Sequence, residues 1–407
     1  MYNLTVHPLA KIPGPKTWGA SRIPFIRSLL RGTIVHDFEK LHRRYGPILR
    51  IAPDEVTFAH PDAWDDIFVA HPGRPQFLKD PTWWARGPGE PNSLISAIDV
   101  DEHAGIRKML SPGFTPRALR QQEPFVQRYV NLLIDRLRGV VASGDDPSST
   151  DKKRGVHWET GVEVDMTPWF NFTTFDIFGD LGFGESFECL ENSRYHPWIA
   201  LLFNSVKAAS FVSAARFYPV LIFVLTKIIP PSLKKMARKH YLQIAEKVDR
   251  RMNYELERPD IMSHVIAQGD KKEGLSDGVI KATFQVLTTA GSETTATALS
   301  GTLNYLINEP EKLKELVKEI RGRFGSAEEI TIDSVRGCEY LNACLHEGLR
   351  LCPPIPWVLP RLVPKGGATV CGVWLPEGVS LPLSLFCLHP PYILTFNRPA
   401  CQSKPGP

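Results

Sequence analysis

The sequence predicts a mainly helical protein with a minor β-sheet. The strongest signal is a long apolar segment, 277–308, whose pattern stays helical over its whole length. Apolar residues at spacings of three and four within 126–137 indicate a second, amphipathic helix. Strand-like alternation is confined to short runs flanking 52–55 and to 369–375 and 379–385. Helices therefore dominate, and the strands form a small accessory sheet.

Composition bounds the class of protein. The chain has 407 residues, of which 43% are hydrophobic and 23% are charged, which is typical of a soluble-type globular protein with a large core. The net charge of +4 is small, and no basic block is interleaved with aromatic residues, so nucleic-acid binding is not expected. The seven cysteines lack metal-ligand spacing, which predicts reduced thiols and no metal site built from protein ligands.

The first half of the chain alternates loops with short elements. The segment IPGPK (12–16) predicts a rigid turn, and 36–45 has the spacing of a helix. A hairpin is expected around 52–55, where two strand-like runs meet. Residues 71–100 are rich in Pro, Gly and Trp and predict a long irregular loop. Helices take over from 126 onward.

The second half is dominated by helices. Residues 142–155 predict a polar surface loop, and 165–182 predict an apolar helix. No internal repeat is visible, so one domain is expected. A charged helix follows Pro310, and its predicted buried side carries Leu313, Leu316, Val317 and Ile320.

One apolar stretch combines with basic residues. FYPVLIFVLTKIIPP (217–231) is shorter than the ~18 residues that a membrane span needs, and KKMARKH follows it closely. This combination fits an interfacial membrane contact over 217–239. A buried helix with a solvated basic end explains the same pattern equally well.

The segment AGSETT (290–295) is unusual for the middle of a long helix, because glycine and hydroxyl residues are poor helix formers. Gly291 removes a side chain, so that a flat ligand could approach the backbone. The Thr294 hydroxyl can bond the carbonyl of Ala290 and leave a polar notch beside Glu293. Such a notch could hold a small ligand and pass protons to it. The alternative is a helix with a few hydroxyls on its outer face.

A second motif is EGLR (347–350), in which Glu347 and Arg350 share a helix face and can pair. Such pairs are common on solvated helices, so the motif alone is weak. It leads directly into PPIPWVLPR, which predicts an extended exit and places Arg361 shortly afterward.

AGSETT, EGLR and PPIPWVLPR, in this order, resemble the cytochrome P450 superfamily of heme-thiolate monooxygenases. HAGIR (103–107) resembles that family's W/H-x-x-x-R element. The segments at 170–187 and 3–16 are similar to its fungal microsomal branch. The resemblance covers 1–390 as one domain, and 391–407 is expected to be a tail outside the family pattern.

The resemblance implies a role for each matched residue. Glu293 and Thr294 would relay protons to dioxygen, and Ala290 and Gly291 would line the groove over a heme b. His103, Arg107 and Arg361 match the cations that contact the heme propionates in the family. Glu347 and Arg350 match the structural ion pair that stabilises the heme-binding core.

The implied function is an oxidation of fungal secondary metabolism, similar to that of trichothecene hydroxylases. One oxygen atom of dioxygen would enter a small apolar natural product. Electrons would come from NADPH through a separate reductase, and the expected location is the cytosolic face of the endoplasmic reticulum. Residues lining the substrate pocket would come from 77–98, 200–216, 283–291 and 355–360.

The sequence departs from the family at its iron ligand. The family cysteine lies in F-x-x-G-x-R-x-C-x-G, and the pattern fades after LHPP (388–391). Phe396, Arg398 and Cys401 lack the glycines, and only six residues follow Cys401, so no last core helix is expected. No anchor is expected before the Pro-Gly-Pro turn, so membrane contact would rest on 217–239, or the chain would be cytosolic.

Three hypotheses follow from these features. The first is an active monooxygenase. The second, favoured for this polypeptide, is a catalytically inactive member that lacks the thiolate. The third is a non-catalytic protein that uses the fold to bind a ligand or a partner.

Overall fold

The structure is a computed structural model of the 407-residue chain. The account below is confined to the residues that it describes, which are 1–84, 86, 89–144, 147–148, 162–196, 199, 210–218, 220, 223, 231–254, 258–269 and 276–384.

Helices make up most of the described chain. Residues 210–216 are helical as well. In chain order the α-helices are α1 Tyr2–Thr5, α2 Lys16–Ala20, α3 Ile23–Leu30, α4 Ile34–Tyr45, α5 Asp62–Phe68, α6 Pro81–Trp84, α7 Val100–Leu110, α8 Pro116–Ser143, α9 Met166–Phe183, α10 Cys189–Asn192, α13 Pro231–Asn253, α14 Ile261–Gly269, α15 Asp277–Ile307, α16 Pro310–Arg323 and α17 Glu339–Leu351. Single 3-10 turns are η1 Pro8–Lys11, η2 Ser111–Phe114, η3 Ala327–Glu329 and η4 Ser334–Gly337.

The strands are short and form two sheets. They are β1 Ile48–Ala52, β2 Glu55–Phe58, β3 Leu78–Lys79, β4 Trp357–Leu362, β5 Ala368–Val370, β6 Val373–Leu375 and β7 Ser380–Ser384. The larger sheet has the order β1-β2-β7-β4-β3, and β5 pairs with β6. β2 and β7 run parallel, and the other neighbours in the larger sheet are antiparallel. The mainly helical class with a minor sheet is confirmed.

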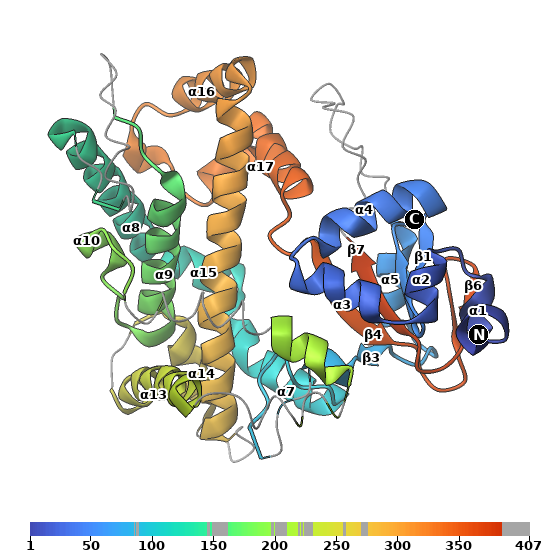
Figure 1. The fold of residues 1–407 in the computed structure, drawn as a ribbon. Helices are drawn as coiled ribbons and strands as arrows, with labels where there is room; N and C mark the ends of the chain where they lie inside the picture. Colours follow the sequence, from blue (N-terminus) through green and yellow to red (C-terminus); the bar gives the residue numbers. More distant parts are fainter. Residues whose placement is uncertain are drawn as a thin grey trace.

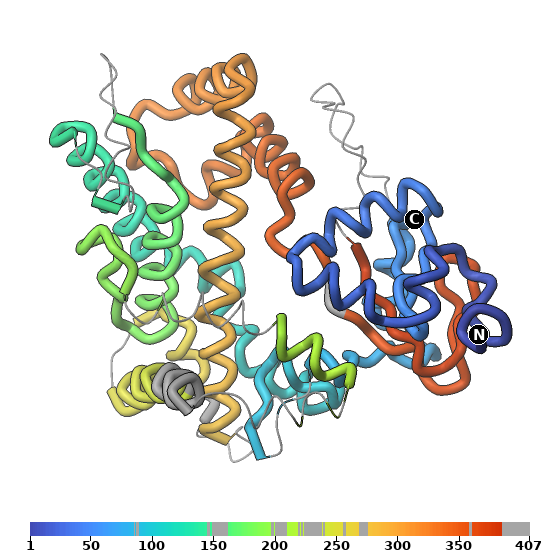
Figure 2. Tube along the Cα trace, in the orientation of Figure 1, coloured from blue at the N-terminus to red at the C-terminus, as the bar shows by residue number. Residues whose placement is uncertain are grey.

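The molecule has a helical part and a sheet part. α15 runs the length of the helical part beside α9, and the larger sheet lies among α1 to α5 (Figure 1). Figure 2 shows that the N-terminal and C-terminal segments of the described chain meet in the sheet part. α17 leads directly into β4 and so connects the two parts.

α9 is a buried helix that packs against α15. Trp169, Phe172 and Phe175 are almost fully buried in the largest core cluster. Asp165 begins the helix by accepting a hydrogen bond from the Thr167 N–H, and Gly184 ends it in the left-handed region. The helix is apolar on all sides because neighbouring helices cover all of its faces.

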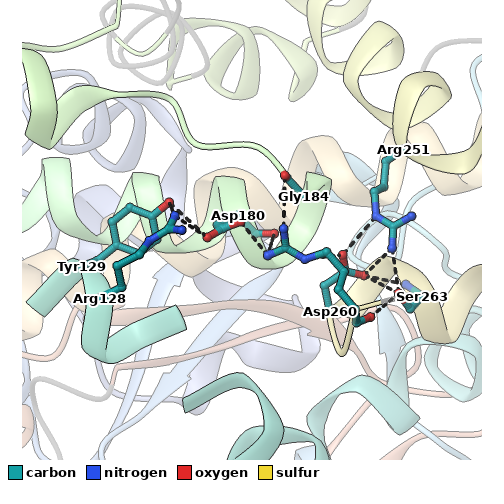
Figure 3. Close-up of polar contacts among 8 residues, drawn as sticks. Arg128, Tyr129, Asp180, Gly184, Arg251, Asp260 and Ser263 are labelled. Atoms are coloured by element: carbon teal, nitrogen blue, oxygen red, sulfur yellow. Dashed lines mark hydrogen bonds and ion pairs between the residues drawn. The ribbon is translucent and has the colours of Figure 1, made fainter. Parts of the chain in front are cut away.

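Hydrogen bonds and ion pairs between polar residues link α8, α9, α13 and α14 (Figure 3). Asp180 of α9 accepts hydrogen bonds from Arg128 and Tyr129 of α8, at 2.9 and 3.1 Å, and from Arg258, at 2.6 Å. Asp260, just before α14, binds Arg251 of α13. This network supports the helices that pack on α9 and α15.

Several predicted elements have the expected bounds. The helix expected over 165–182 is α9, the one over 277–308 is α15, and the hairpin around 52–55 is the β1–β2 pair. The polar loop 142–155, the apolar stretch 217–239 and the tail 391–407 lie wholly or largely outside the described residues. None of the helices in the described ranges is both long and apolar enough to cross a bilayer.

Other predictions were wrong. Residues 71–100 contain β3 and α6, which have no local signal because β3 pairs with the distant strand β4. The strand expected at 369–375 is the β5–β6 hairpin, which turns at Cys371 and Gly372 with φ of 48° and 76°. No described residue of α16 is buried, because α16 lies at one end of the helical part (Figure 1), where it contacts α15, α17 and the Gly337 carbonyl of η4.

Candidate functional site

The middle of α15 contains the predicted polar notch. The Thr294 hydroxyl donates to the Ala290 carbonyl at 2.6 Å, and the Thr295 hydroxyl donates to the Gly291 carbonyl at 3.1 Å. These bonds engage the hydroxyl protons, so each hydroxyl oxygen remains able to accept another hydrogen bond. Ala290 and Gly291 are exposed although they lie at the centre of a core helix. Here α15 presents polar backbone and hydroxyl groups instead of apolar side chains.

Gly291 also has a packing role that the sequence did not suggest. A Cβ atom at this position would lie 3.1 Å from Cδ2 of Phe178 on α9. The missing side chain therefore lets α9 and α15 pack closely, and it does not open a path for a ligand from that direction. The sequence could not show this, because the neighbour of a helix face depends on tertiary packing.

Replacing Gly291 with Val should therefore loosen the α9–α15 interface. Overpacking of this kind costs about 1–3 kcal/mol, which should appear as a lower midpoint in urea unfolding. Gly139→Val on α8 is the matched control, because no described atom beyond the backbone of its own helix lies within 4 Å of the added Cβ. Equal midpoints for the two variants would contradict the packing role of Gly291.

Glu293 lies half-buried beside the hydroxyls. Burial raises the pKa of its carboxyl above the ordinary value of 4.5. Its charge also contributes to the raised pKa of Tyr195, which reaches about 12 mainly through burial of the phenol. A carboxyl with a raised pKa keeps its proton at a higher pH than a solvated one, which suits a group that delivers protons.

The raised pKa makes stability depend on pH. The folded protein disfavours ionised Glu293, so its contribution to stability is complete below pH 4.5 and falls as the pH rises through the higher folded pKa. Glu293→Gln removes this ionisation. We expect a higher thermal midpoint than wild type at pH 7 and a difference that shrinks toward pH 4. Glu311→Gln, on the exposed start of α16, is the control. A difference independent of pH would contradict this interpretation.

A second group of predicted residues meets at a cavity of about 660 Å³. His103 and Arg107 reach it from α7, and Arg361 reaches it from β4. His71 and Arg74 also line it, and Asp66 is the only carboxylate among the described residues that line it. The cavity is therefore strongly cationic.

Two of these basic side chains have acid partners, since Arg74 lies 3.7 Å from Asp66 and His71 lies 3.3 Å from Asp65, whereas no carboxylate of the described residues forms an ion pair with Arg361. Arg361 contacts the Phe77 carbonyl at 3.4 Å and lies 5.5 Å from the Phe68 ring, and burial lowers the pKa of its guanidinium. Burial, and then the charges of Lys79, Arg107 and Arg361, lower the pKa of His103. A buried cation without an acid partner gains from binding an anion. The cavity is therefore suited to a ligand that carries two carboxylates along one edge.

Glu347 and Arg350 form the predicted pair on α17. The guanidinium makes two hydrogen bonds to the carboxylate, at 2.6 and 2.5 Å. Their side chains are 21% and 20% exposed, so the pair is partly shielded from water. α17 packs against α15 and leads into β4, so the pair lies where it can stabilise the connection to Arg361.

The predicted site residues fall into three places. His103, Arg107 and Arg361 share one cavity. Ala290, Gly291, Glu293 and Thr294 lie on α15 and do not line that cavity, and Glu347 and Arg350 lie on α17.

Five cysteines are described, and all are free thiols. Burial raises the pKa of Cys189 to about 12 and the pKa values of Cys344 and Cys371 to about 11. Cys189 and Cys344 are also only 0% and 3% exposed, so protein atoms surround these two thiols and leave no room for an iron-bound group beside them. Cys387 and Cys401 lie outside the described residues.

Sequence reasoning missed three basic residues at or near the cavity. His71 and Arg74 line it, and Lys79 lies in β3 beside Arg361. All three fall in the segment expected to be an irregular loop. Their only local signal was positive charge in a stretch that is rich in proline and tryptophan.

Comparisons with known proteins agree with these observations. Residues 13–391 match the family model described as Cytochrome P450. Cytochrome P450 monooxygenase lcsI of Purpureocillium lilacinum is 40% identical over 388 residues, which are 94% of this chain and 72% of the relative. Cytochrome P450 monooxygenase cpaH of Aspergillus oryzae is 39% identical over 96% of this chain and 72% of its own length. Averantin hydroxylase of Dothistroma septosporum is 38% identical over 381 residues, which are 93% of this chain and 68% of the relative.

Proposed function

The chain belongs to the cytochrome P450 family, and from this premise we propose that its fold serves a heme-dependent monooxygenase of fungal secondary metabolism. The substrate is a small apolar natural product. The observation that carries the proposal is the cavity at which His103, Arg107 and Arg361 meet, and no carboxylate in the described part of the chain forms an ion pair with any of the three. The similarity to fungal monooxygenases, one of them named for hydroxylating averantin, supports the same reaction class.

His103, Arg107 and Arg361 would hold the propionates of heme b through charge-assisted hydrogen bonds. When bound, the heme supplies the redox chemistry that reduces dioxygen and transfers one oxygen atom to the substrate. Burial raises the pKa of Glu293, so its carboxyl keeps its proton to a higher pH than a solvated carboxyl does. The Thr294 hydroxyl donates its hydrogen bond to the Ala290 carbonyl, so its oxygen can accept a hydrogen bond from water. The pair therefore provides a proton donor and an acceptor on adjacent residues.

The family receives electrons from a redox partner, and we propose that this partner is NADPH–cytochrome P450 reductase at the endoplasmic reticulum. Support for membrane contact comes from the described part of 217–239, where Val220 is 76% exposed and Phe223 is 64% exposed. Large apolar side chains that face solvent, in a stretch of sequence followed by basic residues, favour an interfacial location.

We further propose that a polypeptide of these 407 residues does not ligate iron through a thiolate and is therefore inactive. The sequence contains no F-x-x-G-x-R-x-C-x-G segment. Cys189 and Cys344 are buried within the protein, which argues against either of them as a substitute ligand.

A chimera tests the proposed function. Residues 1–391 are joined to the heme-loop segment of a family member that carries the F-x-x-G-x-R-x-C-x-G motif. We expect the chimera to bind heme and to show the red-shifted carbon-monoxide band of thiolate ligation, and a Cys→Ser change in the graft should abolish the band. A folded chimera that binds no heme would overturn the proposed function.

A further inference from the structure

Lys79 is a buried lysine that the proposed chemistry does not use. It lies in β3, where its backbone pairs with that of Arg361 in β4, and only 8% of the residue is exposed. Its Nζ donates to the carbonyl oxygens of Leu94 at 3.0 Å, Ile95 at 2.9 Å and Ala97 at 2.8 Å. An ammonium group has three donors, so each one has a carbonyl partner.

These carbonyls hold Lys79 without an ion pair. No carboxylate in the described ranges forms a salt bridge with it, although the charge of Glu102 favours the protonated amine. Burial and the charge of Arg361 act in the opposite direction and lower the pKa of Lys79 to about 8. A buried ammonium is costly unless its hydrogen bonds are complete. Burial of Lys79 and the conformation of residues 94–97 therefore depend on each other.

The same loop, residues 92–97, is tied to two more elements. The Leu94 N–H donates to the Thr283 hydroxyl of α15 at 3.3 Å. Asn92 donates to the Glu102 carboxylate of α7 at 2.9 and 3.1 Å. Lys79 thus connects the strand pair that carries Arg361 to a loop that rests on the central helix. Thr283 precedes Ala290 by about two turns, or about 10 Å along α15.

The loop also presents an apolar side chain to solvent. Ile95 is 40% exposed, whereas Ala97 is buried in the helical core. The loop therefore has one side fixed in the core and another side open, next to a stretch of α15 expected to border the substrate.

We propose that Lys79 is a positioning residue that fixes the loop 92–97 against α15 and so sets where an apolar substrate lies. The substrate part of this inference rests on the proposed function. The anchoring part does not, because it concerns contacts within the chain itself. Lys79 acts through the loop carbonyls, and Ile95 is the side chain that it would place against the substrate.

Hydrogen exchange of the 407-residue chain tests the anchoring. The reporter amides are those of Ser93, Leu94, Ser96 and Ala97, which are hydrogen-bonded within the loop or to Thr283. We expect Lys79→Met to exchange at least tenfold faster at these amides, with α9 unchanged. Lys79→Arg should restore part of the protection, because a guanidinium also donates to several carbonyls. Lys318→Met, on the exposed side of α16, is the control.

Two exchange results would overturn the proposal. One is unchanged protection in Lys79→Met. The other is faster exchange that extends equally through α9 and α15, which would make Lys79 a general stability residue.

Binding of the apolar dye Nile red tests the substrate part. We expect Lys79→Met to raise the dissociation constant for Nile red at least threefold. Lys79→Arg should recover part of the lost affinity. Equal affinity in Lys79→Met and wild type would remove the link between the loop and ligand placement. Failure of the proposed function appears separately, as absence of heme in the chimera while the loop remains protected.

Discussion

Replacing Asp260 with Ala should cost about 3–5 kcal/mol of unfolding free energy, because it leaves a buried charge without its partner. Arg251 is bound to Asp260 at 3.0 and 3.2 Å, and their side chains are only 3% and 0% exposed. The carboxylate also accepts hydrogen bonds from the Ser263 N–H and hydroxyl, both at 2.8 Å. A loss of this size is a large part of the 5–15 kcal/mol typical of a folded protein.

Urea unfolding at neutral pH measures this loss. The control is Asp135→Ala, whose partner Arg138 is an exposed residue on the same helix. An exposed pair contributes about 0–1 kcal/mol, so its midpoint should hardly move. Replacing both buried partners, as in Arg251→Met with Asp260→Leu, should recover much of the stability, because no lone charge remains. Equal losses for Asp260→Ala and Asp135→Ala would contradict the role of this network (Figure 3).

Replacing Arg361 with Leu should weaken binding of a porphyrin dicarboxylate by about 10- to 100-fold. Hydrogen bonds to charged groups contribute about 1.5–3 kcal/mol each, and the half-buried Arg361 forms no ion pair with a carboxylate of the described residues. Protoporphyrin IX without iron is the right probe, because it carries both propionates and needs no thiolate. Fluorescence titration of the 407-residue chain gives the dissociation constant.

Two controls isolate the charge effect. Arg138→Leu makes the same change in net charge on the exposed surface of α8 and should leave the affinity unchanged. The dimethyl ester of protoporphyrin IX has no carboxylates and should bind wild type and Arg361→Leu alike. If Arg361→Leu bound the free acid as well as wild type does, the cationic cavity would not be the propionate site.

Parts of this structure that depend on local patterns could be predicted from the sequence. The helical period over 277–308 located α15, and the spacing of four residues predicted the hydrogen bond from Thr294 to Ala290. The spacing of three predicted the pair of Glu347 and Arg350. The family resemblance is confirmed by the comparisons.

Features that depend on distant partners could not be predicted. Gly291 faces Phe178 only because α9 packs on that side of α15. The partners of Lys79 lie 15, 16 and 18 residues away in a loop without a periodic pattern. The parallel pairing of β2 with β7 joins opposite ends of the chain. Local propensity contains no information on such contacts, because tertiary packing selects them.

The iron ligand decides whether this polypeptide can act as the family does. The measurement is the carbon-monoxide difference spectrum of the reduced 407-residue chain, expressed with excess heme. We predict no red-shifted band, because these 407 residues contain no F-x-x-G-x-R-x-C-x-G segment and because Cys189 and Cys344 are buried by protein atoms. A red-shifted band of thiolate ligation would contradict this account and would show that a cysteine of this chain ligates the iron.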